Sequence, residues 1–149
     1  MSELERVIIG SDHGAFLLKE KLRAFIAESG IDVEDAGTYS DASVSYVDYA
    51  KKVAGAVSSG KFKKGILLCG TGLGMSMAAN RFPGVRAALC SDLFSARMSR
   101  EHNDSNILVI GGRVTGDILA IEIVKVWLET PFEGGRHLKR IQSIEDILK

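Results

Sequence analysis

The sequence predicts a single doubly wound α/β domain, in which helices cover both faces of a mostly parallel sheet of about five strands. Three observations support this fold class. Short apolar runs alternate along the chain with longer segments of helical periodicity. The runs are apolar throughout, as expected for strands buried on both faces. The 149 residues show no repeat, linker or low-complexity tract, so one domain accounts for the chain.

In chain order, the expected elements are a strand at 7–10, a helix at 15–29, a strand at 31–35, a helix at 46–58, a strand at 65–69, a helix at 74–81, a strand at 85–90, a helix at 91–103, a strand at 107–110 and helices at 118–128 and 141–148. Each strand is an apolar run such as VIIG. Each helix repeats its apolar residues every three or four positions. The first carries Leu18, Leu22 and Ile26 on one face and stops at Gly30.

Composition and charge exclude several classes of protein. Lys and Arg together number 19, as do Asp and Glu, so no overall charge favours nucleic acid or an acidic membrane. The N-terminus lacks the pattern of a signal peptide, and no apolar stretch approaches the roughly 20 residues of a membrane span. Cys69 and Cys90 each end an apolar run, which is typical of reduced thiols and unsuited to zinc. We therefore expect a cytoplasmic protein that builds any anion site locally.

In a doubly wound sheet, ligands bind at the loops that follow the carboxyl ends of the strands, and the glycine-rich loop CGTGLG is one of these. Gly70, Gly72 and Gly74 give G-x-G-x-G, whereas the dinucleotide fingerprint needs its third glycine at the position of Met75. No G-K-[ST] follows, so the P-loop pattern is also missing. A nucleotide site stays open as a weaker alternative. The N–H groups of the loop, with the Thr71 hydroxyl, are suited to stabilise an oxyanion or a phosphate.

Cys69 lies directly beside this loop, where N–H groups and the start of a helix favour the thiolate form of its side chain. A thiolate next to an oxyanion site is suited to remove a proton from the carbon beside a carbonyl. Free cysteines are usually small buried hydrophobes, and on these grounds alone the two interpretations of Cys69 balance. Cys90 ends VRAALC with no glycine loop after it, so we expect it to be structural.

Two histidines and their neighbours follow other elements. GSDHG ends the first strand with Asp12, which either caps the next helix or contacts a ligand. His13 lies in the first helical turn, where a cation opposes the helix dipole and a bound anion would explain it. His102 and Asn103, in SREHND, fit an ordinary helix ending as well as a catalytic role.

Three arginines complete the candidate residues. Arg113 follows the glycines of the last strand, and Arg136 and Arg140 share one face if their segment is helical. Arginines in a neutral protein are usually solvated surface charges. Near a glycine-rich turn, however, arginine is the usual partner of a phosphate.

Five segments together resemble the type B ribose 5-phosphate isomerases, a family that includes allose 6-phosphate isomerase and the galactose 6-phosphate isomerase subunits. The segments are GSDHGAFLLK, ILLCGTGLGMSMAANR, ARMSREHNDSN, GGRV and FEGGRHLKR, in family order. The resemblance implies a Rossmann-like α/β/α sandwich and a homodimer, or a dimer of dimers, with active sites at the subunit interface. It implies no metal or organic cofactor. The implied reaction converts ribose 5-phosphate and ribulose 5-phosphate in the non-oxidative pentose phosphate pathway.

The resemblance also gives roles to the candidate residues. Cys69 matches the base that moves a proton between C2 and C1 of the open-chain sugar, in the branch of the family without a glutamate at the position of Met75. Thr71 and the glycine loop match the group that holds the enediolate, and His102 matches the residue that opens the furanose ring. The remaining matches bind substrate, with sugar hydroxyls on Asp12 and Asn103 and the phosphate on His13, Arg113, Arg136 and Arg140.

One segment departs from the family pattern. Where the family has Asp-Tyr-Pro-Asp, the chain has SYVD. Tyr46, expected beside the sugar, is kept, whereas Ser45 and Val47 replace aspartate and proline. Without proline the loop is less preset, which leaves the sugar preference open. Two alternatives therefore remain: an isomerase of a six-carbon sugar 6-phosphate such as allose or galactose 6-phosphate, and a non-catalytic module that binds a sugar phosphate or nucleotide.

Overall fold

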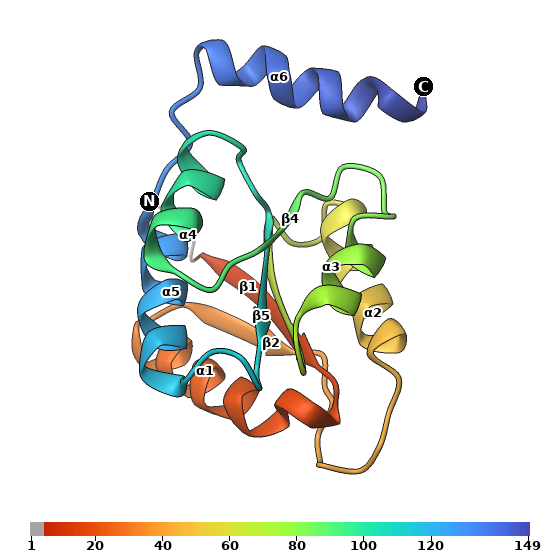
Figure 1. Cartoon of the computed structure of the whole chain (residues 1–149), viewed down its shortest axis with the longest axis vertical. Coiled ribbons are helices and arrows are strands. Elements are labelled where there is room, and N and C mark those ends of the chain that lie inside the picture. Colours follow the sequence, from red (N-terminus) through yellow and green to blue (C-terminus); the bar gives the residue numbers. More distant parts are fainter. Residues whose placement is uncertain (1–4) are drawn as a thin grey trace.

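Five parallel strands form one sheet at the centre of the protein (Figure 1). The computed structural model describes residues 5–149. The strands lie in the order β2-β1-β3-β5-β4, and every neighbouring pair is parallel. Their bounds are β1 Arg6–Ser11, β2 Asp32–Asp35, β3 Lys64–Cys69, β4 Ala87–Leu89 and β5 Ile107–Gly111. The predicted fold class and number of strands are therefore confirmed.

Helices cover both faces of the sheet and bury a separate apolar cluster on each (Figure 1). One face carries α1 Phe16–Glu28, α4 Leu93–Glu101 and α5 Asp117–Glu129, and the other carries α2 Tyr46–Ser58 and α3 Leu73–Ala79. The cluster under the first group includes Trp127, which is fully buried. Because the central strands are covered on both sides, their apolar runs show no alternation, as the sequence indicated.

The last helix, α6 Arg136–Glu145, stands apart from these two layers and runs across the top of the view in Figure 1. A short 3-10 turn, η2 Asp146–Leu148, follows it. The helix predicted at 141–148 was therefore placed too late. The reason is that the first turns of α6 read RHLKR, whose charges hide the apolar periodicity. Its contacts with the body include an ion pair from Arg86 to Glu145 at 2.6 Å.

Other predicted bounds shift by smaller amounts. The helix expected from residue 15 begins at Phe16, after a single 3-10 turn, η1 His13–Ala15. The strand expected at 85–90 is shortened to β4, because it lies at the edge of the sheet and pairs only with β5. Among the described residues, no helix has the length and apolar character that crossing a membrane requires.

Candidate active site

Three loops meet at the carboxyl edge of the sheet and are bonded to one another through their backbones. Cys69 at the end of β3 pairs in register with Gly111 at the end of β5. The Gly112 N–H donates to the Cys69 carbonyl at 2.8 Å, and the Arg113 N–H donates to the Gly70 carbonyl at 2.9 Å. On the other side, the Asp12 N–H donates to the Leu68 carbonyl at 3.2 Å. The order of the parallel strands thus brings the predicted loops together.

The Cys69 thiol is turned toward the glycine loop. Its Sγ accepts a hydrogen bond from the Gly72 N–H at 3.2 Å, and the residue is 5% exposed. Gly72 has a φ of 81°, and a Cβ there would lie 2.5 Å from a Leu89 methyl, so this loop geometry requires glycine. The side chain packs in the apolar cluster beneath α2 and α3, as a small hydrophobe would. The backbone donor aimed at the sulfur is what favours a reactive thiol.

Thr71 and Tyr46 border the same loop. The Thr71 Oγ1 accepts a hydrogen bond from the Leu73 N–H at 3.2 Å, which leaves its own hydroxyl hydrogen available for a ligand. Tyr46 is 40% exposed, and its ring lies against Gly74, where a Cβ would come within 2.6 Å of it. Gly74 therefore permits the aromatic ring to lie over the start of α3.

Asp12 is buried at this edge with an unsatisfied oxygen. Its carboxylate does not cap the following turn, and within the part of the chain that the structure describes, Oδ1 has no hydrogen-bond partner. A Cβ built on Gly14 would lie 3.4 Å from both Asp12 Oδ1 and an Arg113 Nη atom. The carboxylate and the guanidinium thus converge on one spot. A buried carboxylate oxygen without a donor is costly unless a ligand supplies one.

His13 presents one nitrogen to the site. Its Nδ1 accepts a hydrogen bond from the Val44 N–H at 3.1 Å. A ring nitrogen that accepts from a backbone N–H carries no proton, so the hydrogen of the neutral imidazole is on Nε2. That N–H is free to donate to an anion, which agrees with the predicted phosphate contact.

The remaining candidates lie at the other end of the sheet. His102 is the C-terminal cap of α4, Asn103 follows it, and both precede β5, whereas Cys69 pairs with the last residue of β5. β5 has five residues, about 16 Å at the usual rise of a strand. Arg136 and Arg140 both lie on α6, so the condition under which they share one helix face is met. Their charges act on His137, whose ring stacks on that of His102. One copy of the chain therefore does not assemble all the candidate residues.

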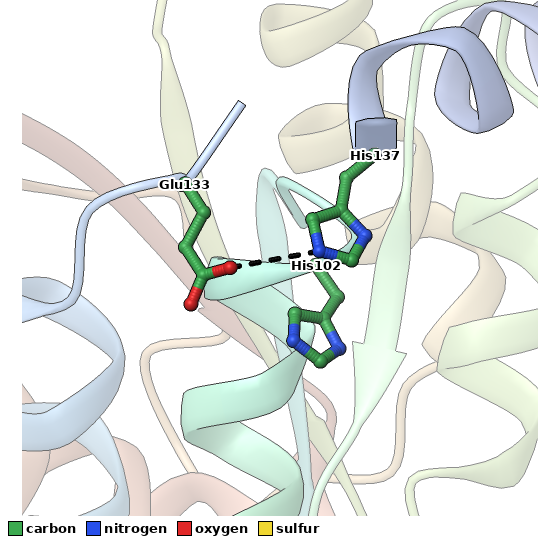
Figure 2. Close-up of side chains that lie close together, drawn as sticks. All are labelled: His102, Glu133 and His137. Carbon is green, nitrogen blue, oxygen red and sulfur yellow. Dashed lines mark ion pairs between the residues drawn. The ribbon is translucent and has the colours of Figure 1, made fainter. Parts of the chain in front are cut away.

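Beside His102 the structure places two residues that the sequence analysis did not single out, Glu133 and His137 (Figure 2). The imidazoles of His102 and His137 stack with centroids 4.3 Å apart and planes 14° apart. His137 Nε2 lies 3.5 Å from a Glu133 carboxylate oxygen. Burial lowers the pKa of His137, and the charges of His102 and Arg136 lower it further. The only sign of this contact in the sequence is that Glu133 and His137 are four residues apart. The segment has no apolar periodicity, so the sequence does not predict a helix there.

Among the described residues, these three side chains form the one group whose potential metal-ligand atoms lie close together. One such atom from each residue lies within 4.8 Å of the others. Two histidines and a carboxylate would suit zinc. A ring nitrogen, however, directs its lone pair in the plane of the ring, and two nearly parallel rings direct theirs along separate planes. The stacked arrangement is therefore not a chelate, because one ring would have to turn before both could reach one ion.

The ribose/galactose isomerase family matches residues 7–144, which covers both the carboxyl-edge loops and α6. The chain belongs to this family. It is accordingly an isomerase, and its sheet and helices are those of the family's α/β fold.

Individual family members are similar over nearly their whole length. Ribose-5-phosphate isomerase B of Escherichia coli is 46% identical over 97% of each chain. D-Erythrulose-4-phosphate isomerase of Pectobacterium atrosepticum is 39% identical over 93% of this chain and 91% of its own. A ribose 5-phosphate isomerase from Thermotoga maritima is 54% identical in sequence. Its crystal structure matches this one with a TM-score of 0.94, over 97% of this chain and 100% of the Thermotoga chain.

Proposed function

We propose that the protein interconverts D-ribose 5-phosphate and D-ribulose 5-phosphate, with Cys69 as the base. The observation that carries the proposal is the Cys69 thiol held against the Gly72 N–H, at the edge where Asp12 has a buried oxygen without a partner. The sulfur removes the proton from C2 of the open-chain aldose and returns it to C1. Between these two steps the negative charge lies on the oxygen at C1, and a proton passes to that oxygen from the hydroxyl at C2. The carbonyl forms at C2 as C1 takes the proton from the thiol, so atoms and charge balance without an external oxidant.

The residues around Cys69 stabilise the intermediate and bind the ends of the sugar. The Thr71 hydroxyl and the N–H groups of the glycine loop stabilise the enediolate oxygen, where preorganised donors contribute most. Asp12 accepts from sugar hydroxyls. Met75, at the position of the glutamate base in the other branch of the family, is fully buried and apolar, so it offers no competing base.

We propose that a second copy of the chain completes the site, in a homodimer or a dimer of dimers. His102 would then open the furanose ring and Asn103 would hold a hydroxyl from the partner's side. Arg136 and Arg140 would bind the phosphate together with His13 and Arg113. Two features support this arrangement: the separation of these groups within one chain, and large exposed apolar side chains at Val114, Ile118, Leu138 and Ile144. Cys69 and Cys90 are both free thiols, which agrees with a cytoplasmic protein.

The altered SYVD segment gives no specific support to a six-carbon substrate. Ser45 caps α2 by accepting from the Val47 N–H at 3.2 Å, as the usual aspartate could. Tyr46 still lies against Gly74. Because the loop is held without its proline, ribose 5-phosphate remains the favoured substrate. Because one relative is named for a four-carbon sugar phosphate, D-erythrulose 4-phosphate, the number of carbons in the sugar is the substrate property to test.

Proton NMR of ribose 5-phosphate in deuterium oxide tests the proposal directly. The parent protein should form ribulose 5-phosphate and incorporate deuterium at the carbon that exchanges. Cys69→Ala should lose at least 100-fold in rate, the usual scale for removing a base. Cys90→Ala is the matched control and should retain turnover. A parent that binds the sugar phosphate without converting ribose, allose or galactose phosphates would be a binding module, and a fully active Cys69→Ala variant would move the base elsewhere.

A further inference from the structure

His137 is a buried titratable residue next to the proposed site, and no role has yet been given to it. The residue is only 6% exposed, although it carries a polar ring on the outermost helix. Figure 2 shows the ring lying over that of His102, with the Glu133 carboxylate beside the edge of the His137 ring at Nε2. A buried imidazole in face-to-face contact with a second imidazole is an unusual use of a surface helix, and it calls for an explanation.

The backbone around the two rings is bonded so that the stack is held in place. The Glu133 N–H donates to the Glu101 carbonyl in the last turn of α4 at 3.1 Å. The Arg100 Nε donates to the Thr130 carbonyl at 3.1 Å, just after α5. The segment between α5 and α6 is therefore attached to the end of α4, directly beside His102. Two hydrogen bonds thus fix the segment before His137 against the end of α4, so the contact between the rings is not a chance approach of two surface side chains.

Histidine needs such support to act in one orientation. Its χ2 torsion joins an sp³ to an sp² carbon and has a broad energy minimum, so the ring turns easily. His102 is also at the end of its helix, where the backbone constrains the side chain least. The nearly parallel stack, with planes 14° apart, restricts that rotation.

We propose that His137 is a positioning residue for His102: its stacked imidazole holds the His102 ring in the orientation that opens the sugar ring. The inference rests on the proposed function, because it acts through the role of His102. In that reaction His102 moves a proton between the ring oxygen and the hydroxyl at C1, so the direction of its ring nitrogens decides the rate. His137 itself contacts no reacting atom.

The charge state of His137 suits this role. Its pKa is lowered by burial, by His102 at the end of α4, and by Arg136 and Arg140 on α6, against the opposing carboxylate of Glu133. At neutral pH His137 is therefore uncharged, and its ring stacks on that of His102 without adding a charge to the contact. In acid His137 gains a proton, and the charges of Arg136 and Arg140 repel it, so the stack should loosen.

The test separates ring opening from isomerisation by using two substrates. The exchange of the two anomers of ribose 5-phosphate, followed by NMR in a Cys69→Ala background, reports ring opening without turnover. The consumption of ribulose 5-phosphate reports the proton transfer alone, because this ketose has its terminal hydroxyl phosphorylated and stays open. The variants are His137→Ala, His137→Phe and, as a control on the same helix, the exposed Gln142→Ala.

We expect His137→Ala to slow anomer exchange about tenfold, a part of the 10²–10⁴ that an acid–base residue supplies. The KM and kcat for ribulose 5-phosphate should stay within about twofold. His137→Phe keeps a flat ring and should restore exchange, and it should also abolish the decline of exchange in acid that His137 protonation causes. Gln142→Ala should match the parent, and His102→Asn should lose exchange.

Several results would overturn the inference. Unchanged exchange in His137→Ala would do so, as would equal losses with both substrates, which would indicate general damage to α6. If His137→Ala does not fold, His137→Phe provides the test by itself. The inference then requires that this variant exchange the anomers at nearly the parent rate and that its rate decline less at acidic pH. A rate that rises with added Zn²⁺ and falls with a chelator would make the cluster a metal centre instead. A parent that converts neither substrate would refute the proposed function itself, which is a distinct outcome.

Discussion

At the residue scale, the two cysteines end similar apolar runs but have different surroundings. Cys69 accepts a backbone hydrogen bond from the glycine loop, whereas Cys90 is 2% exposed within the cluster on the opposite face. Burial raises the pKa of the Cys90 thiol to about 11, and a hydrogen bond with Ser99 offsets only part of that effect. In the sequence, only Cys69 is followed by a glycine loop, which predicts a structural role for Cys90 and leaves Cys69 open between a base and a small buried hydrophobe.

The raised pKa of Cys90 predicts a specific loss of stability in alkali. An unfolded cysteine has a pKa of about 8.5, so the folded state retains its proton to higher pH than the unfolded state. The contribution of Cys90 is therefore fully present below about pH 8.5 and is lost as pH rises toward 11, by on the order of 2 kcal/mol. Urea unfolding of the parent and of Cys90→Ala at pH 8 and pH 10.5 measures it. The variant should lose less stability between the two values; identical losses would contradict the assignment.

At the scale of elements, a buried ion pair fixes the loop that leads to the site. Lys19 on α1 is fully buried, and its Nζ contacts both Asp35 carboxylate oxygens, at 2.7 and 2.8 Å. Asp35 ends β2 and also accepts from the Gly37 N–H at 2.9 Å. The pair thus connects α1, β2 and the start of the segment that carries Tyr46 into α2.

Removing Lys19 should be costly because it takes the nearer cation from the partly buried Asp35 carboxylate and leaves it only the longer pair with Arg23, at 3.6 Å. Lys19→Met is expected to lower the free energy of unfolding by about 3 kcal/mol. The matched control is Lys21→Met, which breaks the exposed pair with Asp117 and should cost less than about 1 kcal/mol. Urea unfolding of both variants gives the comparison. Equal and small losses would mean that the Lys19–Asp35 pair contributes little.

Most elements were predictable because apolar periodicity and turn residues determine them locally. The helix at 46–58 was predicted with the bounds of α2, and the apolar runs at 7–10 and 107–110 lie within β1 and β5. The start of α6 was not, since its first residues contact the end of α4 through His137 and carry no apolar pattern. The burial of Lys19 was missed for the same reason: it depends on Asp35, which is distant in the sequence.

At the scale of the whole molecule, the proposed site residues of one chain lie in two groups at opposite ends of its sheet. The carboxyl edge carries Cys69 and Asp12, and the opposite end carries His102 with the arginines of α6. The motifs and the family resemblance proposed each residue, but no property of the sequence places the two groups relative to each other. A parallel sheet keeps its carboxyl ends on one edge, so a helix returning from that edge must deliver His102 to the other.

If two chains share each site, mixing two inactive variants should restore activity. One variant is Cys69→Ala; the other is the double variant Arg136→Ala/Arg140→Ala, which lacks the proposed phosphate contacts. In a mixed dimer, one site combines both defects and the other has neither. Random exchange of equal amounts makes half of the dimers mixed, so about a quarter of the parent activity should return. Ribulose 5-phosphate formation before and after joint unfolding and refolding measures the recovery. As the control, each variant is refolded separately and should remain inactive. A mixture that also stays inactive would place each complete site within one chain, in conflict with the separation of Cys69 from α6.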